Sequence, residues 1–148
     1  MKYLLDTCVI SELIKPRPNE NVINWIAKQK EQNLYISVLS FGEIQKGIEK
    51  CVDSKRKQHL QLWVKNDLYN RFKNRVLAID ITVANKWGEV QAHTEKRGQP
   101  MPSIDGLIAM TGLVNDCIVV TRNTSDMENS TAELLNPWES SLMQNDKL

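Results

Sequence analysis

The chain has 148 residues, of which 41% are hydrophobic and 25% are charged, and its formal net charge at pH 7 is +1. This length and composition favour one compact domain and exclude a disordered chain. The small net charge excludes a general attraction to polyanions. The three cysteines have neither an even count nor the spacing of a zinc site, which favours a reducing cytoplasm and excludes a disulfide framework.

The amino-terminal segment gives the clearest local pattern. Residues 3–5 predict a short buried strand, Asp6 follows at its carboxyl end, and apolar side chains then recur at helical spacing over residues 9–14. Asp6 is reached too soon for a signal peptide, and no apolar run is long enough to cross a bilayer. We therefore expect a protein that is neither exported nor inserted in a membrane.

The next unit repeats the order of a strand followed by a helix. Residues 21–29 predict a helix, residues 34–38 a second strand, and a helical pattern begins at Ser40. Glu43 lies near the start of that helix. Ser40 and Glu43 have the spacing of a capping box, in which the glutamate returns to the serine amide. Taken alone, this structural role is the ordinary interpretation of Glu43.

Residues 50–75 carry a local charge of +6, because eight basic side chains outnumber two acidic ones. Such a segment can follow a phosphate backbone. It can equally be the solvated face of an amphipathic helix over residues 55–72 whose apolar side chains are buried. The sequence leaves these two interpretations open.

The second half of the chain continues the alternation. Residues 76–79 predict a strand, residues 82–96 a helix, and Ser103 can cap a further helix with Asp105 in its first turn. Residues 117–121 form the last clear strand, followed by a polar segment that ends in Asp126. Strands that alternate with helices predict a three-layer α/β/α sandwich with a mostly parallel central sheet.

Four acidic residues lie at the edges of these apolar segments: Asp6, Glu43, Asp105 and Asp126. Each has an ordinary role as a cap or turn residue, but their joint placement favours convergence at one edge of the sheet. Clustered carboxylates repel unless a cation compensates them, and Mg²⁺ or Mn²⁺ prefers oxygen ligands. Such a centre suits phosphodiester hydrolysis.

The order and spacing of these motifs resemble a PIN-domain ribonuclease, and most closely a VapC-type toxin of a type II toxin–antitoxin system. The segments that carry the resemblance are Leu5-Asp6-Thr7 with residues 9–13, Ser37-Val38, residues 42–48, Pro102-Ser103-Ile104-Asp105 with residues 107–109, Thr121-Arg122-Asn123 with Asp126, and Leu135-Asn136-Pro137-Trp138. The resemblance implies one PIN-like nuclease domain over residues 1–138, and we expect a loose tail at residues 139–148.

The resemblance also implies a site and its chemistry. The expected catalytic acids are Asp6, Glu43, Asp105 and Asp126, with Asp6 and Asp105 holding the metal and Thr7, Thr121 and Asn123 supporting them. Members of the family cleave RNA with Mg²⁺, for which Mn²⁺ can substitute. They are inhibited by a small cognate antitoxin and commonly form homodimers. We therefore expect a cytoplasmic, metal-dependent endoribonuclease that acts as the toxin of such a pair.

Other functions use the same residues less well. A catalytically inactive PIN-like module that binds protein or RNA is the main alternative, and the complete acidic set argues against it. Neither His59 nor His93 lies in a nucleophile motif, which disfavours a catalytic triad. A phosphoacceptor receiver domain also places acids at strand ends, but the spacing here differs from its arrangement.

Overall fold

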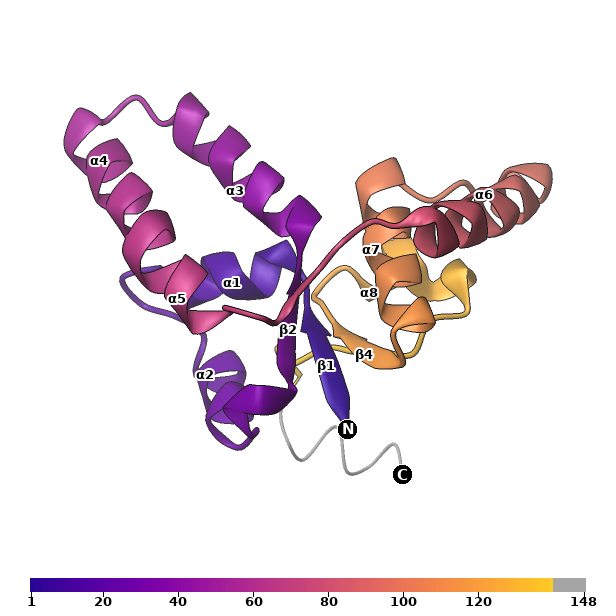
Figure 1. The fold of residues 1–148 in the computed structure, drawn as a ribbon, viewed down its shortest axis with the longest axis horizontal. Coiled ribbons are helices and arrows are strands. Elements are labelled where there is room, and N and C mark those ends of the chain that lie inside the picture. Colours follow the sequence, from indigo (N-terminus) through magenta and orange to yellow (C-terminus); the bar gives the residue numbers. More distant parts are fainter. Residues whose placement is uncertain (140–148) are drawn as a thin grey trace.

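The computed structural model describes residues 1–139 and has a five-stranded sheet at its centre (Figure 1). All strand pairs are parallel, and the spatial order is β3-β2-β1-β4-β5. The strands are β1 (Lys2–Leu5), β2 (Leu34–Ser37), β3 (Val76–Leu77), β4 (Cys117–Val120) and β5 (Leu134–Leu135). The predicted parallel sheet is therefore confirmed. The strand expected at residues 76–79 ends two residues early.

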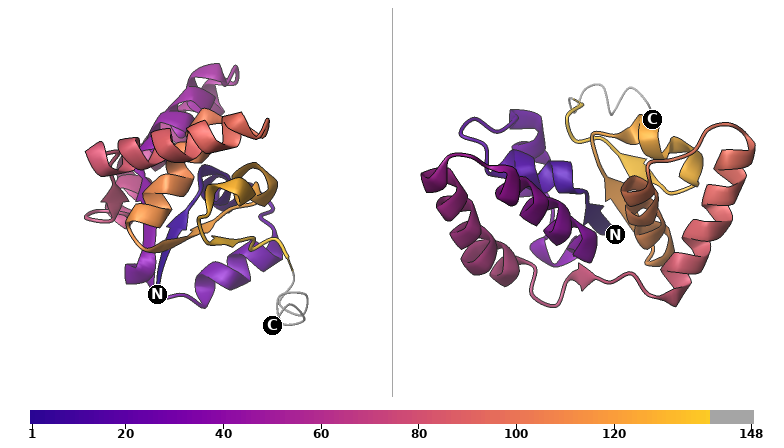
Figure 2. Two further views of the ribbon diagram at one scale, coloured as in Figure 1. Left: turned by 90° about the vertical axis from the view of Figure 1, so that its right-hand side faces the viewer. Right: turned by 90° about the horizontal axis from the view of Figure 1, so that it is seen from above.

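Helices cover the sheet in two groups, which separate clearly when the molecule is viewed from above (Figure 2). The first group comprises α1 (Thr7–Leu13), α2 (Glu20–Ala27), α3 (Val38–Lys50), α4 (Ser54–Leu62), the π-helix η2 (Trp63–Leu68) and α5 (Tyr69–Arg71). The second comprises α6 (Ile81–Lys96), α7 (Ser103–Val114) and α8 (Thr124–Met127). Two short 3₁₀ helices complete the description, η1 (Glu31–Asn33) and η3 (Glu128–Ser130).

Two hydrophobic cores lie on the two faces of the sheet. Leu5 and Val120 are paired in register and belong to the core under the first group of helices. Their neighbours Leu4 and Val119 belong to the core under the second group. Successive side chains of a strand point to opposite faces, so the continuous apolar runs of β1 and β4 supply both cores. This arrangement confirms the predicted three-layer sandwich.

Close packing of α7 on β4 depends on Gly112. A Cβ at this position would overlap Cγ2 of Val119 and would lie 3.4 Å from the Cys117 carbonyl oxygen. Helix and strand therefore approach through a residue without a side chain, and an added methyl group would overpack this core. The contact fixes how far α7, and the acid that it carries, stands from the sheet.

The helix expected over residues 55–72 is interrupted by a π-helical segment. Its core-facing side chains, Val64, Leu68 and Phe72, follow a spacing of four and are at most 9% exposed. In a regular α-helix, residues four apart drift around the axis because a turn holds 3.6 residues. The wider turn of η2 reduces this drift and keeps all three side chains in the core.

Two further expectations concern chain ends and caps. The N-cap residue of α7 is Pro102, which has no side chain able to cap the helix, and Ser103 is the first residue of the helix itself. The predicted capping role of Ser103 is therefore wrong.

The boundary at residue 138 stays a prediction, because the expected tail at 139–148 lies outside the described residues apart from Glu139. Within residues 1–139, no helix is both long and apolar enough to span a bilayer.

Candidate metal-binding site

The predicted site residues come from elements that meet at the carboxyl edge of the sheet. Asp6 directly follows β1 and Thr121 directly follows β4. Glu43 lies in α3, which continues from β2, and Asp105 lies in the first turn of α7. The two helices rise from this edge on opposite sides (Figure 1). In parallel α/β sheets this edge is where ligands bind.

Asp6 is buried and held in one orientation. Its side chain is 3% exposed, and Oδ1 accepts a hydrogen bond from the Thr7 amide at 2.8 Å. Oδ2 accepts a second one from Oγ1 of Thr121 at 2.7 Å. Burial raises the pKa of Asp6, and these hydrogen bonds oppose that rise. A carboxylate oxygen has two lone pairs, so Oδ1 keeps one that can face a cation, whereas Oδ2 also accepts a weak hydrogen bond from Sγ of Cys8 at 3.6 Å.

Thr7 connects Asp6 to the acid on α3. Its Oγ1 donates to Oε1 of Glu43 at 2.6 Å and lies 2.8 Å from Oγ of Ser40. The capping box expected for Ser40 and Glu43 is wrong, because α3 begins earlier and its cap is Ser37, which accepts from the Leu39 amide. Glu43 therefore does not cap the helix, and its carboxylate accepts the hydrogen bond from Thr7 instead. Ser40 is a site neighbour that the sequence pattern assigned to the cap.

The pKa of Asp105 depends on burial and on the charges of the three other acids. Burial raises the pKa of Asp105 to about 6, and nearby negative charges add to this effect. In order of influence, these charges are Asp6, Asp126 and Glu43. Within residues 1–139, none of the four acids makes an ion pair with a basic side chain. The acids therefore form a cluster of negative charge that no basic side chain of the described residues compensates by an ion pair.

The loop after β4 is tied to Asp6 by hydrogen bonds that cross most of the sequence. The Asn123 amide donates to Oγ1 of Thr121 at 2.9 Å, so Asn123 contacts Thr121 through its main chain, and its predicted supporting role stays a prediction. The Arg122 amide donates to Sγ of Cys8 at 3.5 Å, and that thiol lies 3.6 Å from Oδ2 of Asp6. Cys8 is thus a site neighbour, and its only sequence signal was its position two residues after Asp6.

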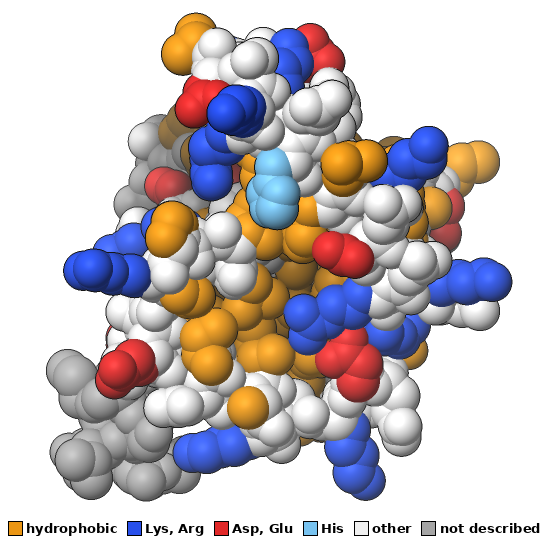
Figure 3. Space-filling view, turned by 90° about the vertical axis from the view of Figure 1, so that its left-hand side faces the viewer, with side chains coloured by type: hydrophobic (Ala, Val, Ile, Leu, Met, Phe, Trp, Pro, Cys, Tyr) orange, Lys and Arg blue, Asp and Glu red, His pale blue; other side chains and the backbone are white. Residues whose placement is uncertain are grey.

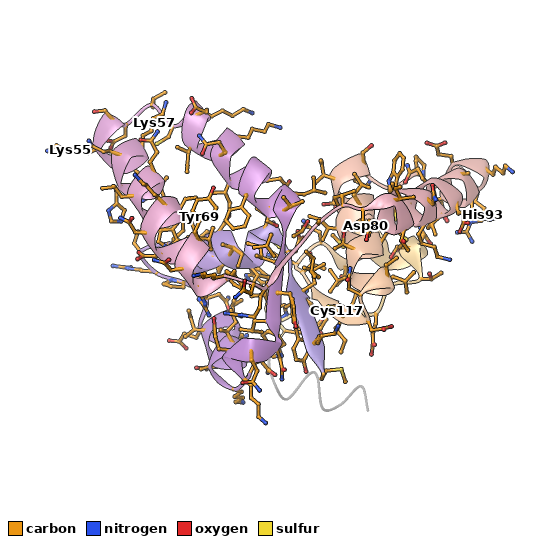
Figure 4. The ribbon with its side chains drawn as sticks, viewed as in Figure 1. Lys55, Lys57, Tyr69, Asp80, His93 and Cys117 are labelled. Atoms are coloured by element: carbon orange, nitrogen blue, oxygen red, sulfur yellow. The ribbon has the colours of Figure 1, made fainter. Side chains whose placement is uncertain are left out.

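The same contacts decide the chemistry of Cys8. Burial and then the charge of Asp6 raise the pKa of its thiol to about 11. A nucleophilic cysteine needs a thiolate, so the environment of Cys8 disfavours that role. His59 and His93 are exposed, and His93 lies at the distal end of α6 (Figure 4). These positions give no support to the histidine-based alternative.

The donor set fits a small, hard cation. In the part of the chain that the structure describes, no three Asp, Glu, His or Cys side chains stand close enough to share one ion directly. Mg²⁺ is commonly held by one or two carboxylates together with water and substrate phosphate oxygens. Asp6, oriented by its hydrogen bonds, and Asp105, with its raised pKa, are two carboxylates of the kind that such a partial ligand set uses.

The basic segment has divided roles. Arg71 donates to Oε1 of Glu31 at 2.8 Å and Arg75 contacts the same oxygen at 3.4 Å, so both arginines hold the chain before β2. Lys57 lies 3.6 Å from Glu49. Helices α3 and α4 together form an arm that extends away from the sheet, and Lys55 and Lys57 lie at its far end (Figure 4). Part of the +6 charge therefore stabilises the fold, and only the remainder is free for a polyanion.

An apolar hollow lies on the outer side of that arm and is visible as the central hydrophobic area of Figure 3. We call it the α1–α5 hollow. Its volume is about 180 Å³, and its lining residues are Ile10, Leu13, Ile14, Trp63, Asp67, Leu68, Arg71 and Phe72. The hollow therefore combines an apolar floor with one acidic and one basic side chain. It uses none of the four clustered acids.

A family model for the PIN domain matches residues 3–129. The chain belongs to the PIN-domain family. It is 35% identical to the plasmid stability protein StbB of Pseudomonas syringae pv. tomato, over 92% of this chain and 98% of that protein. It is 32% identical to the VapC ribonuclease Y4jK of Sinorhizobium fredii, over 92% and 97%.

A solved structure agrees with these sequence relationships. The crystal structure of FitAcB from Neisseria gonorrhoeae superposes with a TM-score of 0.88 at 29% identity, covering 93% of this chain and 99% of that one. The PIN-domain assignment predicted from the motif order is therefore confirmed.

Proposed function

We propose that this PIN-domain protein is an endoribonuclease that hydrolyses phosphodiester bonds in RNA and acts as the toxin of a toxin–antitoxin pair. The observation that carries the proposal is the buried, hydrogen-bonded Asp6 together with Asp105, whose pKa is raised by burial and then by the charges of three other acids. Strongly perturbed acids that share a charge cluster are typical of functional sites. Relatives that are named ribonuclease and plasmid stability protein agree with this function.

The proposed cofactor is Mg²⁺, with Mn²⁺ as a substitute, held by Asp6 and Asp105. When bound, the cation polarises a phosphoryl oxygen and offsets charge that develops during hydrolysis. Asp6 is oriented for this role by Thr7 and Thr121. Glu43 and Asp126 complete the catalytic acids in the proposal, and the Asn123 amide supports the site through Thr121. The chain's own residues thus provide orientation and negative charge.

The cellular setting is proposed on the same basis. A toxin of this class acts on RNA in the cytoplasm, and three free cysteines agree with a reducing compartment.

A homodimer is also proposed, and the particle mass measured by light scattering would be twice the chain mass of 17.0 kDa. A particle of single-chain mass at all concentrations would contradict the dimer.

The function is tested by mapping new RNA ends after brief expression of the wild-type chain. We expect new RNA ends that are absent from cells without the wild-type chain, because the proposed centre hydrolyses phosphodiester bonds. Cells that express Asp105→Asn serve as the control for host nucleases. Purified protein that retains RNA tightly but yields no products in Mg²⁺ would instead favour the inactive binding module.

We propose that the cognate antitoxin docks on the α1–α5 hollow. Apolar hollows lined by aromatic and aliphatic side chains are suited to an amphipathic partner segment, and the Asp67 and Arg71 side chains provide its orientation. Ile14→Arg should therefore weaken copurification with the antitoxin at least about tenfold, the usual effect of losing an interface anchor. Its RNA cleavage should be unchanged.

Ile23→Arg is the matched control for this prediction. Ile23 is 38% exposed on α2 and does not line the hollow. Equal antitoxin binding by the wild type and both variants would show that the antitoxin uses another surface.

A further inference from the structure

A second hollow lies between the end of α6 and the segment after α8. Its volume is about 380 Å³, and its lining residues are Val90, His93, Lys96, Arg97, Asn129 and Thr131. We call it the α6–η3 hollow. Asp80 marks the start of α6 and His93 its distal part in Figure 4, so the hollow lies at the end of the helix remote from Asp80.

The lining of the α6–η3 hollow is cationic. It contains the cationic side chains of Lys96 and Arg97 and the imidazole of His93, and no acidic residue belongs to it in the described part of the chain. None of these three side chains forms an ion pair within residues 1–139. Positive charge in the last turn of a helix also stabilises the helix dipole. That role requires neither a hollow nor the polar side chains contributed by Asn129 and Thr131.

We infer that the α6–η3 hollow binds a phosphate group of the RNA strand, an inference that rests on the proposed endoribonuclease function. Arginine and lysine donate charge-assisted hydrogen bonds to phosphate oxygens, and the amide of Asn129 is a further donor. Val90 gives the hollow an apolar floor against which a ribose can pack. The hollow therefore has the chemistry of a nucleotide subsite.

The position of the hollow along the chain links it to the acidic cluster. Asn129 follows Asp126 by three residues, so their Cα atoms are at most about 11 Å apart. The chain between them is helical in α8 and η3, which shortens this distance further. One strand of RNA can thus present one phosphate to the acids and another to the hollow. Binding there would also restrain the short segment that carries Asp126.

The test measures RNA binding without cleavage. All proteins carry Asp6→Asn, which keeps a good helix cap at α1 and removes one proposed metal ligand. The probe is a short, fluorescein-labelled single-stranded polyuridine, and its affinity is measured over a range of salt concentrations. The variant His93→Gln/Lys96→Gln/Arg97→Gln should bind more weakly. Its plot of log affinity against log salt should lose about 0.7 units of slope for each phosphate contact removed, the value for a single strand.

Two further variants make the result specific to the α6–η3 hollow. Arg17→Gln/Lys28→Gln/Lys30→Gln removes three exposed basic side chains elsewhere and should keep the original slope. Lys96→Arg/Arg97→Lys keeps the charges of the hollow and should bind like the parent. The inference would be overturned if both triple glutamine variants lost RNA affinity equally, or if neither lost any. Thermal melts confirm that each variant is folded.

A phosphate titration identifies the source of the ligand. Inorganic phosphate, with chloride as the ionic-strength control, should shift the backbone amide resonances of Asn129 and Thr131. If phosphate shifts them while the triple variant binds RNA normally, the hollow takes free phosphate and the inference of an RNA subsite fails.

These assays separate the subsite from the proposed function. A wild-type chain that cleaves RNA, with a triple variant that binds normally, would refute the subsite alone. A wild-type chain that cleaves no RNA, with binding that still depends on the hollow, would refute the nuclease proposal and keep the phosphate site.

Discussion

Asp105→Asn is expected to abolish RNA cleavage while making the metal-free protein more stable at neutral pH. The loss of cleavage should be at least about 100-fold, as when one electrostatic partner of a transition state is removed. The physical reason is that Asn keeps the shape of Asp105 but loses the charge with which we propose it holds Mg²⁺. Asp6→Asn should cause a similar loss, measured as the rate of product formation from a mapped RNA substrate.

The gain in stability follows from the raised pKa of Asp105. Its pKa is about 6 in the folded chain against 3.8 as the ordinary value. Between these values the folded state binds the proton more tightly, so wild-type stability falls as the pH rises from about 4 to 6. Asn has no such loss. The variant should therefore be more stable by about 1 to 2 kcal/mol above pH 6, a value reduced for the partial exposure of Asp105.

The measurement is urea unfolding of both metal-free proteins at several pH values. The difference should be full above pH 6 and should disappear below about pH 4, where Asp105 is protonated in both states. Asp67→Asn is the control, because Asp67 is exposed on η2 and remote in sequence from the clustered acids. A variant that is less stable than the wild type at pH 7 would contradict the repulsion inferred for this cluster.

Removal of divalent cations by EDTA should stop cleavage by the wild-type chain, and added Mg²⁺ or Mn²⁺ should restore it. The same addition should raise wild-type stability, because the ion binds the folded site and relieves repulsion between carboxylates. At an ion concentration of about 100 times the dissociation constant, the gain is about 2.7 kcal/mol. It is measured as the shift of the unfolding midpoint on Mg²⁺ titration.

The control for metal binding is the same titration with Asp105→Asn, whose midpoint should move much less than that of the wild type. Equal shifts in the two proteins would place the stabilising ion elsewhere. Undiminished cleavage after exhaustive EDTA treatment would exclude the proposed metal dependence itself.

The sequence predicted the sheet because its strands are short apolar runs bounded by polar residues. Leu4 and Leu5 supply opposite faces, and this double burial is visible as a continuous apolar run. The helix over residues 55–72 was less predictable, since the change to π-helical turns depends on packing. Apolar periodicity marks a helix but does not determine how wide each turn is.

The sequence pointed to the four acids of the candidate site, but it did not predict the hydrogen bonds that join them to their neighbours. Asp6 and Asp105 stand out because each follows or begins an apolar element. The hydrogen bond from the Arg122 amide to Cys8 joins residues 114 positions apart and leaves no local pattern. Glu43 shows the opposite problem, because a strong local motif predicted a cap while the tertiary contact with Thr7 prevailed. Distant contacts therefore decided which local interpretation was correct.

The clustered acids are carried by opposite layers of the sandwich. Glu43 belongs to α3, whereas Asp105 belongs to α7, which packs on the other face through Gly112. The thickness of the sheet and the packing of each helix on it thus set the distance between the carboxylates of Glu43 and Asp105. A substitution that loosens either layer would therefore change the spacing of the acids without replacing any of them.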